Sequence, residues 1–112
     1  MNDLTTGPIL LVSLNWRTRA LLAGELGERV ERDVISTSDV DGALALIKLA
    51  GLDPAVIVVD AGRQVSPADV VRLLEAKREV PLALIISGLR REPFETVRER
   101  CAAYLARPVS IG

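Results

Sequence analysis

Asp60, Ser87 and Arg107 each come at the end of a short apolar run of the sequence, and Ser13 and Asn15 come after the first such run. A carboxylate that emerges from an apolar segment is costly to bury unless a cation or solvent reaches it. If these residues meet in the folded chain, they form a small polar pocket in which Arg107 is placed to pair with Asp60.

Several kinds of site are excluded by residues that the chain lacks. It has no histidine and a single cysteine, Cys101, so His-based triads, His zinc sites, internal disulfides and multi-Cys metal sites are ruled out. No glycine-rich phosphate loop follows the first apolar run, which argues against dinucleotide and P-loop sites. A net charge of −1 provides no broad basic surface for nucleic acid. We therefore expect neither an enzyme nor direct nucleic-acid binding.

Short apolar runs alternate with segments of helical period along the whole chain. Ser38 is the expected N-cap of the second helix and Gly51 its end, while Ser66 and Pro67 are the expected start of the third. Pro93 is expected to open the fourth helix. The pattern predicts strands at 9–12, 34–35, 55–60, 82–87 and 103–105, with the first helix beginning at 16.

The third and fourth of these runs are apolar at nearly every position, which is typical of strands covered on both faces. Strict alternation of strands and helices then predicts an α/β fold, a doubly wound parallel sheet of five strands in the flavodoxin-like order 2-1-3-4-5. The functional crevice of such sheets lies beyond the carboxyl ends of the strands. Asp60, Ser87 and Arg107 are therefore expected to converge at that edge.

Length and composition fit one domain. The 112 residues are 49% apolar and 26% charged, which suits a globular core, with residues 1–7 as an N-terminal tail. The longest apolar runs are strand-sized, and Asp3 stands where a signal peptide would be basic. We expect a cytoplasmic protein that does not contact a membrane.

The residues at the strand ends resemble those of response regulator receiver domains, from about Pro8 to Ser110. By that resemblance Asp60 is the candidate phosphoacceptor and Ser87 the switch hydroxyl. Arg107, followed by proline, stands where the family has Lys-Pro, and Tyr104 is similar to the aromatic residue that moves with the hydroxyl. The spacings are 27 residues from Asp60 to Ser87 and 20 from Ser87 to Arg107, close to those usual in the family.

Two departures from the family pattern indicate a degenerate pocket. Receivers hold a divalent cation with an acidic pair after the first strand, where this chain has Ser13 and Leu14. Asp60 alone predicts weak Mg²⁺ binding at best, so no cofactor is expected. Arginine also replaces lysine at 107, and a planar guanidinium is not equivalent to an ammonium. Arg107 and Arg63 are expected to supply part of the missing cation's charge.

The resemblance also implies a fifth helix after Arg107 and Pro108, of which the sequence contains only the start. Its absence would leave one face of the sheet open, so we expect that face to form a homodimer or to meet a partner. A histidine kinase or a downstream signalling protein is the implied partner. Sequence alone does not distinguish a fragment of a longer protein from a chain completed by a second copy.

The favoured interpretation is a receiver-like (pseudo-receiver) signal-transduction module that acts through protein–protein contact, with weak or no phosphorylation at Asp60. One alternative is a functional phospho-accepting receiver domain of a two-component system or phosphorelay. Another is a small-molecule-binding flavodoxin-like domain. Magnesium binding and phosphorylation at Asp60 separate these hypotheses.

Overall fold

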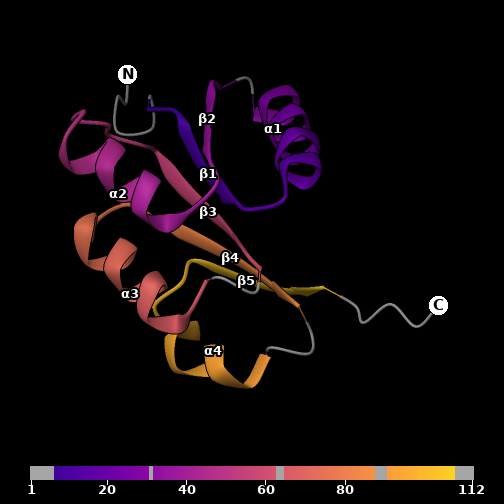
Figure 1. Ribbon diagram of the computed structural model, residues 1–112, viewed down its shortest axis with the longest axis vertical. Coiled ribbons are helices and arrows are strands. Elements are labelled where there is room, and N and C mark those ends of the chain that lie inside the picture. The colour runs from indigo at the N-terminus through magenta and orange to yellow at the C-terminus, as the bar shows by residue number, and fades with distance from the viewer. Residues whose placement is uncertain (1–6, 31, 63–64, 88–90, 108–112) are drawn as a thin grey trace.

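The computed structural model describes residues 7–107 apart from 31, 63–64 and 88–90 (Figure 1). Strands and helices alternate strictly along this part of the chain. In order they are β1 Ile9–Ser13, α1 Trp16–Val30, β2 Val34–Thr37, α2 Val40–Lys48, β3 Val56–Ala61, α3 Pro67–Ala76, β4 Leu82–Ser87, α4 Arg91–Arg98 and β5 Ala103–Arg107.

The five strands form one parallel sheet in the order β2-β1-β3-β4-β5, which confirms the predicted flavodoxin-like topology. The expected fifth helix would follow Arg107, and residues 108–112 lie outside the described part of the chain. No helix within the described ranges is both long enough and apolar enough to cross a membrane.

Local capping explains where the helices start. At α3, Ser66 Oγ accepts from the backbone N–H of Asp69 (3.2 Å), and the Asp69 carboxylate accepts from the backbone N–H of Ser66 (3.1 Å). This reciprocal pair, with Pro67 in the first turn, confirms the predicted start. At α2 the prediction was wrong by one residue. The N-cap is Asp39, whose Oδ1 accepts from Gly42 N at 2.6 Å, and not Ser38.

Helix ends also differ in detail from expectation. Gly51 has a φ of +70°, as predicted for a left-handed residue, but it lies three residues beyond the end of α2 at Lys48. Helix α4 starts at Arg91 rather than at Pro93, because proline is accepted within a first helical turn. Cys101 follows the end of this helix, half-buried, and its thiol donates to the carbonyl of Val97 (3.4 Å).

The sheet divides the core into two layers. Helices α2, α3 and α4 lie side by side over one face, where Leu84 of the sheet, Leu73 of α3 and Phe94 of α4 share the main core (Figure 1). Helix α1 lies on the other side and packs on β1 and β2. Alternation along β5 points Leu105 toward the α1 side of the sheet, and its side chain is 59% exposed. The β5 end of that face is therefore uncovered by the described residues.

Candidate functional site

The register of the sheet brings the ends of four strands to one edge. Ser13 on β1 lies opposite Asp60 on β3, and Ser87 on β4 lies opposite Arg107 on β5. Asp60 pairs with Ile85, so Ser87 is two positions further along the neighbouring strand. The backbone thus places these residues at one edge of the sheet, as expected. The side chains of Ser87 and Arg107, and the whole of Arg63, lie outside the described part.

A hydrogen bond joins Ser13 to the candidate phosphoacceptor. The Oγ of Ser13 donates to Oδ2 of Asp60 at 3.0 Å. Ser13 is only 1% exposed, whereas Asp60 is half-buried. A hydroxyl that donates to a carboxylate forms a charge-assisted bond, and a buried hydroxyl without such a partner would be destabilising. Ser13, the last residue of β1, is therefore a hydrogen-bond donor to Asp60.

Arg19 is a site residue that the sequence reading did not name. Its Nη1 donates to the backbone carbonyl of Ser13 at 2.8 Å, so its guanidinium reaches back from α1 to the end of β1. This contact sets a positive charge beside the strand end that carries the Ser13–Asp60 bond. The only available signal was the position of Arg19 in the first turn after β1, which does not by itself separate this contact from a solvated helix face.

Asn15 has a capping role in the structure. Its Oδ1 accepts from the backbone N–H of Arg17 at 2.9 Å and of Thr18 at 3.2 Å, at the start of α1. Asparagine is a favoured residue for this role because its side chain satisfies amides that have no partner within the helix. Asn15 is exposed and positions α1 beside the pocket edge.

Tyr104 lies against α4. Its hydroxyl donates to Oε2 of Glu95 at 3.0 Å, and the guanidinium of Arg98 lies 5.0 Å from the centre of its ring. Arg98 also forms an ion pair with Glu95 at 3.3 Å. Cation–π contact and hydrogen bonding therefore both fix the ring on the α4 side of the sheet.

Among the described side chains at this sheet edge, Asp60 has a carboxylate and Ser13 has a hydroxyl. Mg²⁺ prefers an octahedron of oxygen ligands that includes carboxylates. Within the described ranges, no group of three or more Asp, Glu, Cys or His side chains could hold a metal ion. Ser13 contributes a hydroxyl whose proton is directed at Asp60, and the side chain of Leu14 contributes no ligand atom.

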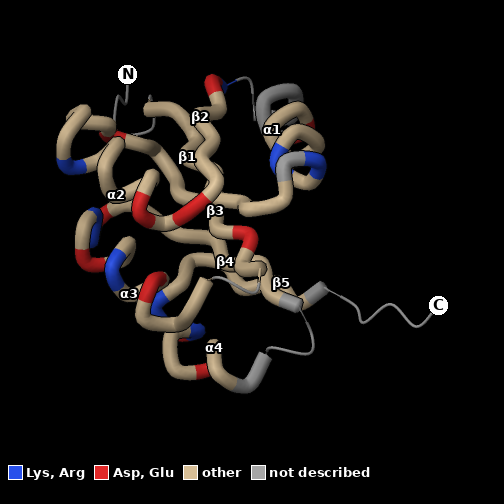
Figure 2. The backbone as a smooth tube through the Cα atoms, in the orientation of Figure 1, with Lys and Arg blue, Asp and Glu red and all other residues tan. Residues whose placement is uncertain are grey.

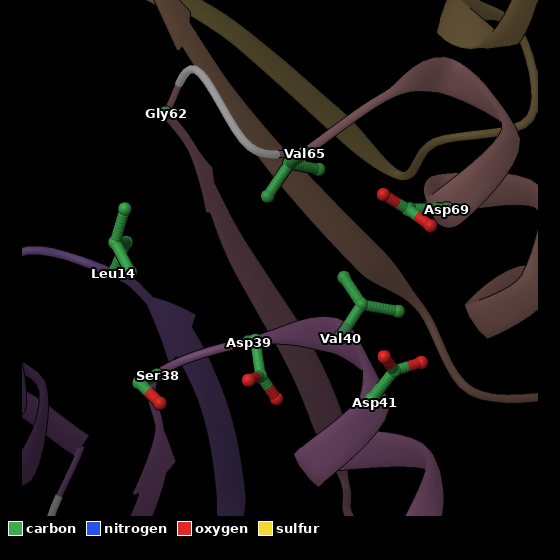
Figure 3. Close-up of a pocket in the computed structure, with 8 residues that line it drawn as sticks. All are labelled: Leu14, Ser38, Asp39, Val40, Asp41, Gly62, Val65 and Asp69. Carbon is green, nitrogen blue, oxygen red and sulfur yellow. The ribbon is translucent and has the colours of Figure 1, made fainter.

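A cleft of about 180 Å³ lies next to this edge (Figure 3). It opens between the β1–α1 connection, the β3–α3 connection and the starts of α2 and α3. Its lining residues are Leu14, Ser38, Asp39, Val40, Asp41, Gly62, Val65 and Asp69.

Comparison with known proteins identifies the fold. No protein family profile matches the sequence, and no curated protein matches it. Solved structures do match. The receiver domain of NtrX from Brucella abortus has a TM-score of 0.74 and 23% identity, over 91% of this chain and 87% of that one. A Vibrio cholerae chemotaxis protein, CheY4, has a TM-score of 0.72 and 17% identity, over 95% of this chain and 90% of that one.

A third similar structure is called an adenylate cyclase, from Rhodopirellula baltica. It has a TM-score of 0.77 and 17% identity, with 95% of this chain and 79% of that chain covered. All three identities are too low to carry function. Together with the strand order, the similarities show that this chain has the receiver-domain fold.

Proposed function

We propose that the chain is a receiver-like signal-transduction module that works by protein–protein contact, with little or no phosphorylation at Asp60. The observation that carries the proposal is the bond from Ser13 to Asp60. At the position where receivers have a metal-binding carboxylate, this chain has a neutral donor. Histidine kinases and downstream signalling proteins are the partners that this reading favours, and no enzymatic reaction is part of it.

The physical argument concerns charge. A phosphoryl group in transfer carries negative charge that a divalent cation ordinarily neutralises. With Asp60 as the single carboxylate expected at the pocket, magnesium would bind weakly, so both gain and loss of a phosphoryl group would be slow. The guanidinium of Arg19 is held by the carbonyl of Ser13 and is a fixed positive charge, not an exchangeable metal. The pocket is therefore better suited to a permanently unphosphorylated state than to a cycle of phosphorylation and dephosphorylation.

The test is beryllofluoride binding in the presence of magnesium, followed by ¹⁹F and amide NMR. We expect no saturable binding by the native chain and a gain of binding when Ser13→Asp and Leu14→Asp are combined. Asp60→Asn in that double variant is the control and should abolish the gain. Tight, magnesium-dependent binding by the native chain would instead support the alternative, a functional phosphoacceptor, which the position of Asp60 at the end of β3 favours.

The part of the sheet that the described residues leave uncovered is the surface that we propose for a second copy. Leu105 is largely exposed, and Ala83 and Ile85 of β4 are half-buried on the same side of the sheet. Apolar side chains in such a position are typical of interfaces. We therefore include homodimerisation through this face in the proposal.

A further inference from the structure

We propose that the cleft between β1–α1, α2 and α3 is a docking site for an arginine side chain of a partner protein. The proposal deepens the proposed function, because it names a surface and a chemistry for the protein–protein contact. The cleft lining does not include Ser13, Asp60 or any residue of β4 and β5. It adjoins that pocket through Leu14 and Gly62 and lies at the same end of the molecule.

The inner part of the cleft is apolar. Val40 and Val65 are each 5% exposed, and in Figure 3 their side chains approach the cleft from opposite sides. Leu14 stands at the rim and is 45% exposed. The side chain of Leu14 therefore gives the rim an apolar wall, whereas a carboxylate at position 14 would be hydrated. Such a surface suits the aliphatic stem of a long side chain, which gains by leaving water.

The outer part of the cleft is acidic. Asp39, Asp41 and Asp69 line it, and Figure 2 shows acidic segments at the starts of α2 and α3. Two of these carboxylates are fixed in place, since Asp39 and Asp69 accept backbone N–H groups at the helix starts. The third, Asp41, has a side chain that is 80% exposed. An occupant with a cationic head would thus meet preorganised partners.

The rim already binds one guanidinium from its own chain. Arg72 donates to Asp41 at 2.9 Å and to Asp69 at 3.2 Å, bridging the two helices. This contact demonstrates that the carboxylates are spaced to receive a planar fork. Among the described side chains of this rim, three carboxylates face this one guanidinium, so negative charge is in excess. An apolar inner part that suits an aliphatic stem and an acidic rim that suits a guanidinium together favour an arginine side chain.

The proposal is tested by titrating the full chain with N-acetyl-arginine amide, followed by amide NMR. We expect saturable shifts at residues 14, 39–42, 62 and 65–69, with a dissociation constant in the millimolar range. N-acetyl-norleucine amide has a similar stem without the charge and should produce no saturable shift there. Norleucine binding as strong as arginine binding would overturn the proposal, as would arginine shifts absent from the cleft.

Two substitutions should change the affinity in opposite directions. Asp41→Asn removes a carboxylate and should weaken arginine binding about threefold, as expected for an exposed ion pair. Arg72→Ala removes the competing guanidinium and should strengthen it by a similar factor. Arg78→Ala is the matched control, because it also removes one exposed, ion-paired guanidinium. Arg78 pairs with Glu75 and does not line the cleft.

An equal gain for Arg72→Ala and Arg78→Ala would attribute the effect to net charge alone and would contradict a specific site. An unchanged affinity for Asp41→Asn would do the same. These readouts are independent of Asp60. Beryllofluoride binding by the native chain would disprove the proposed absence of phosphorylation and would leave the arginine result at the cleft intact. Failure of arginine to bind at the cleft would disprove the docking proposal and would leave the beryllofluoride result intact.

Discussion

At the scale of single residues, the bond from Ser13 to Asp60 is the contact that most changes how the pocket works. Ser13→Ala should lower the free energy of unfolding by about 2 kcal/mol, because a hydrogen bond to a charged group is lost in a part-buried setting. Urea unfolding measures the effect. Ser36→Ala, at an exposed position of β2, is the control and should stay within about 0.5 kcal/mol of the native chain. A Ser13→Ala variant as stable as this control would show that the bond contributes nothing.

Sequence reasoning located this pocket but not its contacts. Asp60 could be placed at a sheet edge because an apolar strand precedes it, and Ser13 because it follows the first strand. Which side chain bonds to which depends on register and rotamer, and a sequence specifies neither. Arg19 was missed for that reason, since its long side chain turns back toward Ser13. The cap at Asp39 was missed because Ser38 beside it is an equally suitable capping residue.

At the scale of elements, replacing either of two helical glycines by alanine should change the stability of the fold in opposite directions. A Cβ at Gly42 in α2 would collide with Oγ1 of Thr37 and come within 3.0 Å of Asp39 Oδ1, the capping oxygen. A Cβ at Gly24 in α1 would meet nothing within 4 Å. Gly24→Ala should therefore stabilise by about 0.5–1 kcal/mol, the usual helix preference. Gly42→Ala should destabilise by about 1 kcal/mol despite the same preference. Thermal and urea unfolding of both variants would test the pair, and a gain at Gly42 would contradict the packing described here.

The start of α3 makes stability depend on pH. The backbone N–H of Ser66 holds the pKa of Asp69 below its usual value; partial burial opposes this lowering, and the Ser66 hydroxyl and Arg72 add smaller contributions to it. Because the folded pKa is lowered, the ionised carboxylate stabilises the fold above the unfolded pKa of about 4, and this is lost as pH falls through the folded value. Asp69→Asn should cost about 1 kcal/mol at pH 7 and progressively less in acid.

Urea unfolding at neutral and acid pH checks this expectation. Asp33→Asn removes an exposed carboxylate away from α3 and controls for the change in net charge. A deficit for Asp69→Asn that is the same at both pH values would show that the helix start does not titrate as described.

At the scale of the whole molecule, the fold was predictable and its surfaces were not. Strands that are apolar at nearly every position, such as β3, require cover on both faces, and alternation with helices then leaves few topologies. The observed order 2-1-3-4-5 follows from those rules. The cleft beside Leu14 could not be predicted, because it depends on how three connections meet in space. The exposure of Leu105 on β5 was similarly beyond the sequence, since this residue has the same apolar character as the buried Leu84.

The exposed β5 face gives the last prediction. Helix α1 packs on β1 and β2, so Leu105 and its neighbours on β4 lack a covering helix among the described elements. Exposed apolar surface of this kind favours association, and in a two-fold dimer the same patch meets itself. Sedimentation velocity over a range of concentrations should detect a reversible dimer of the native chain. Leu105→Glu should weaken it at least tenfold, because two like charges would face each other in a desolvated contact. Leu49→Glu, at an 86% exposed leucine beyond α2, is the control and should leave dimerisation unchanged. A native chain that stays monomeric at every concentration would mean that this face does not bind a second copy.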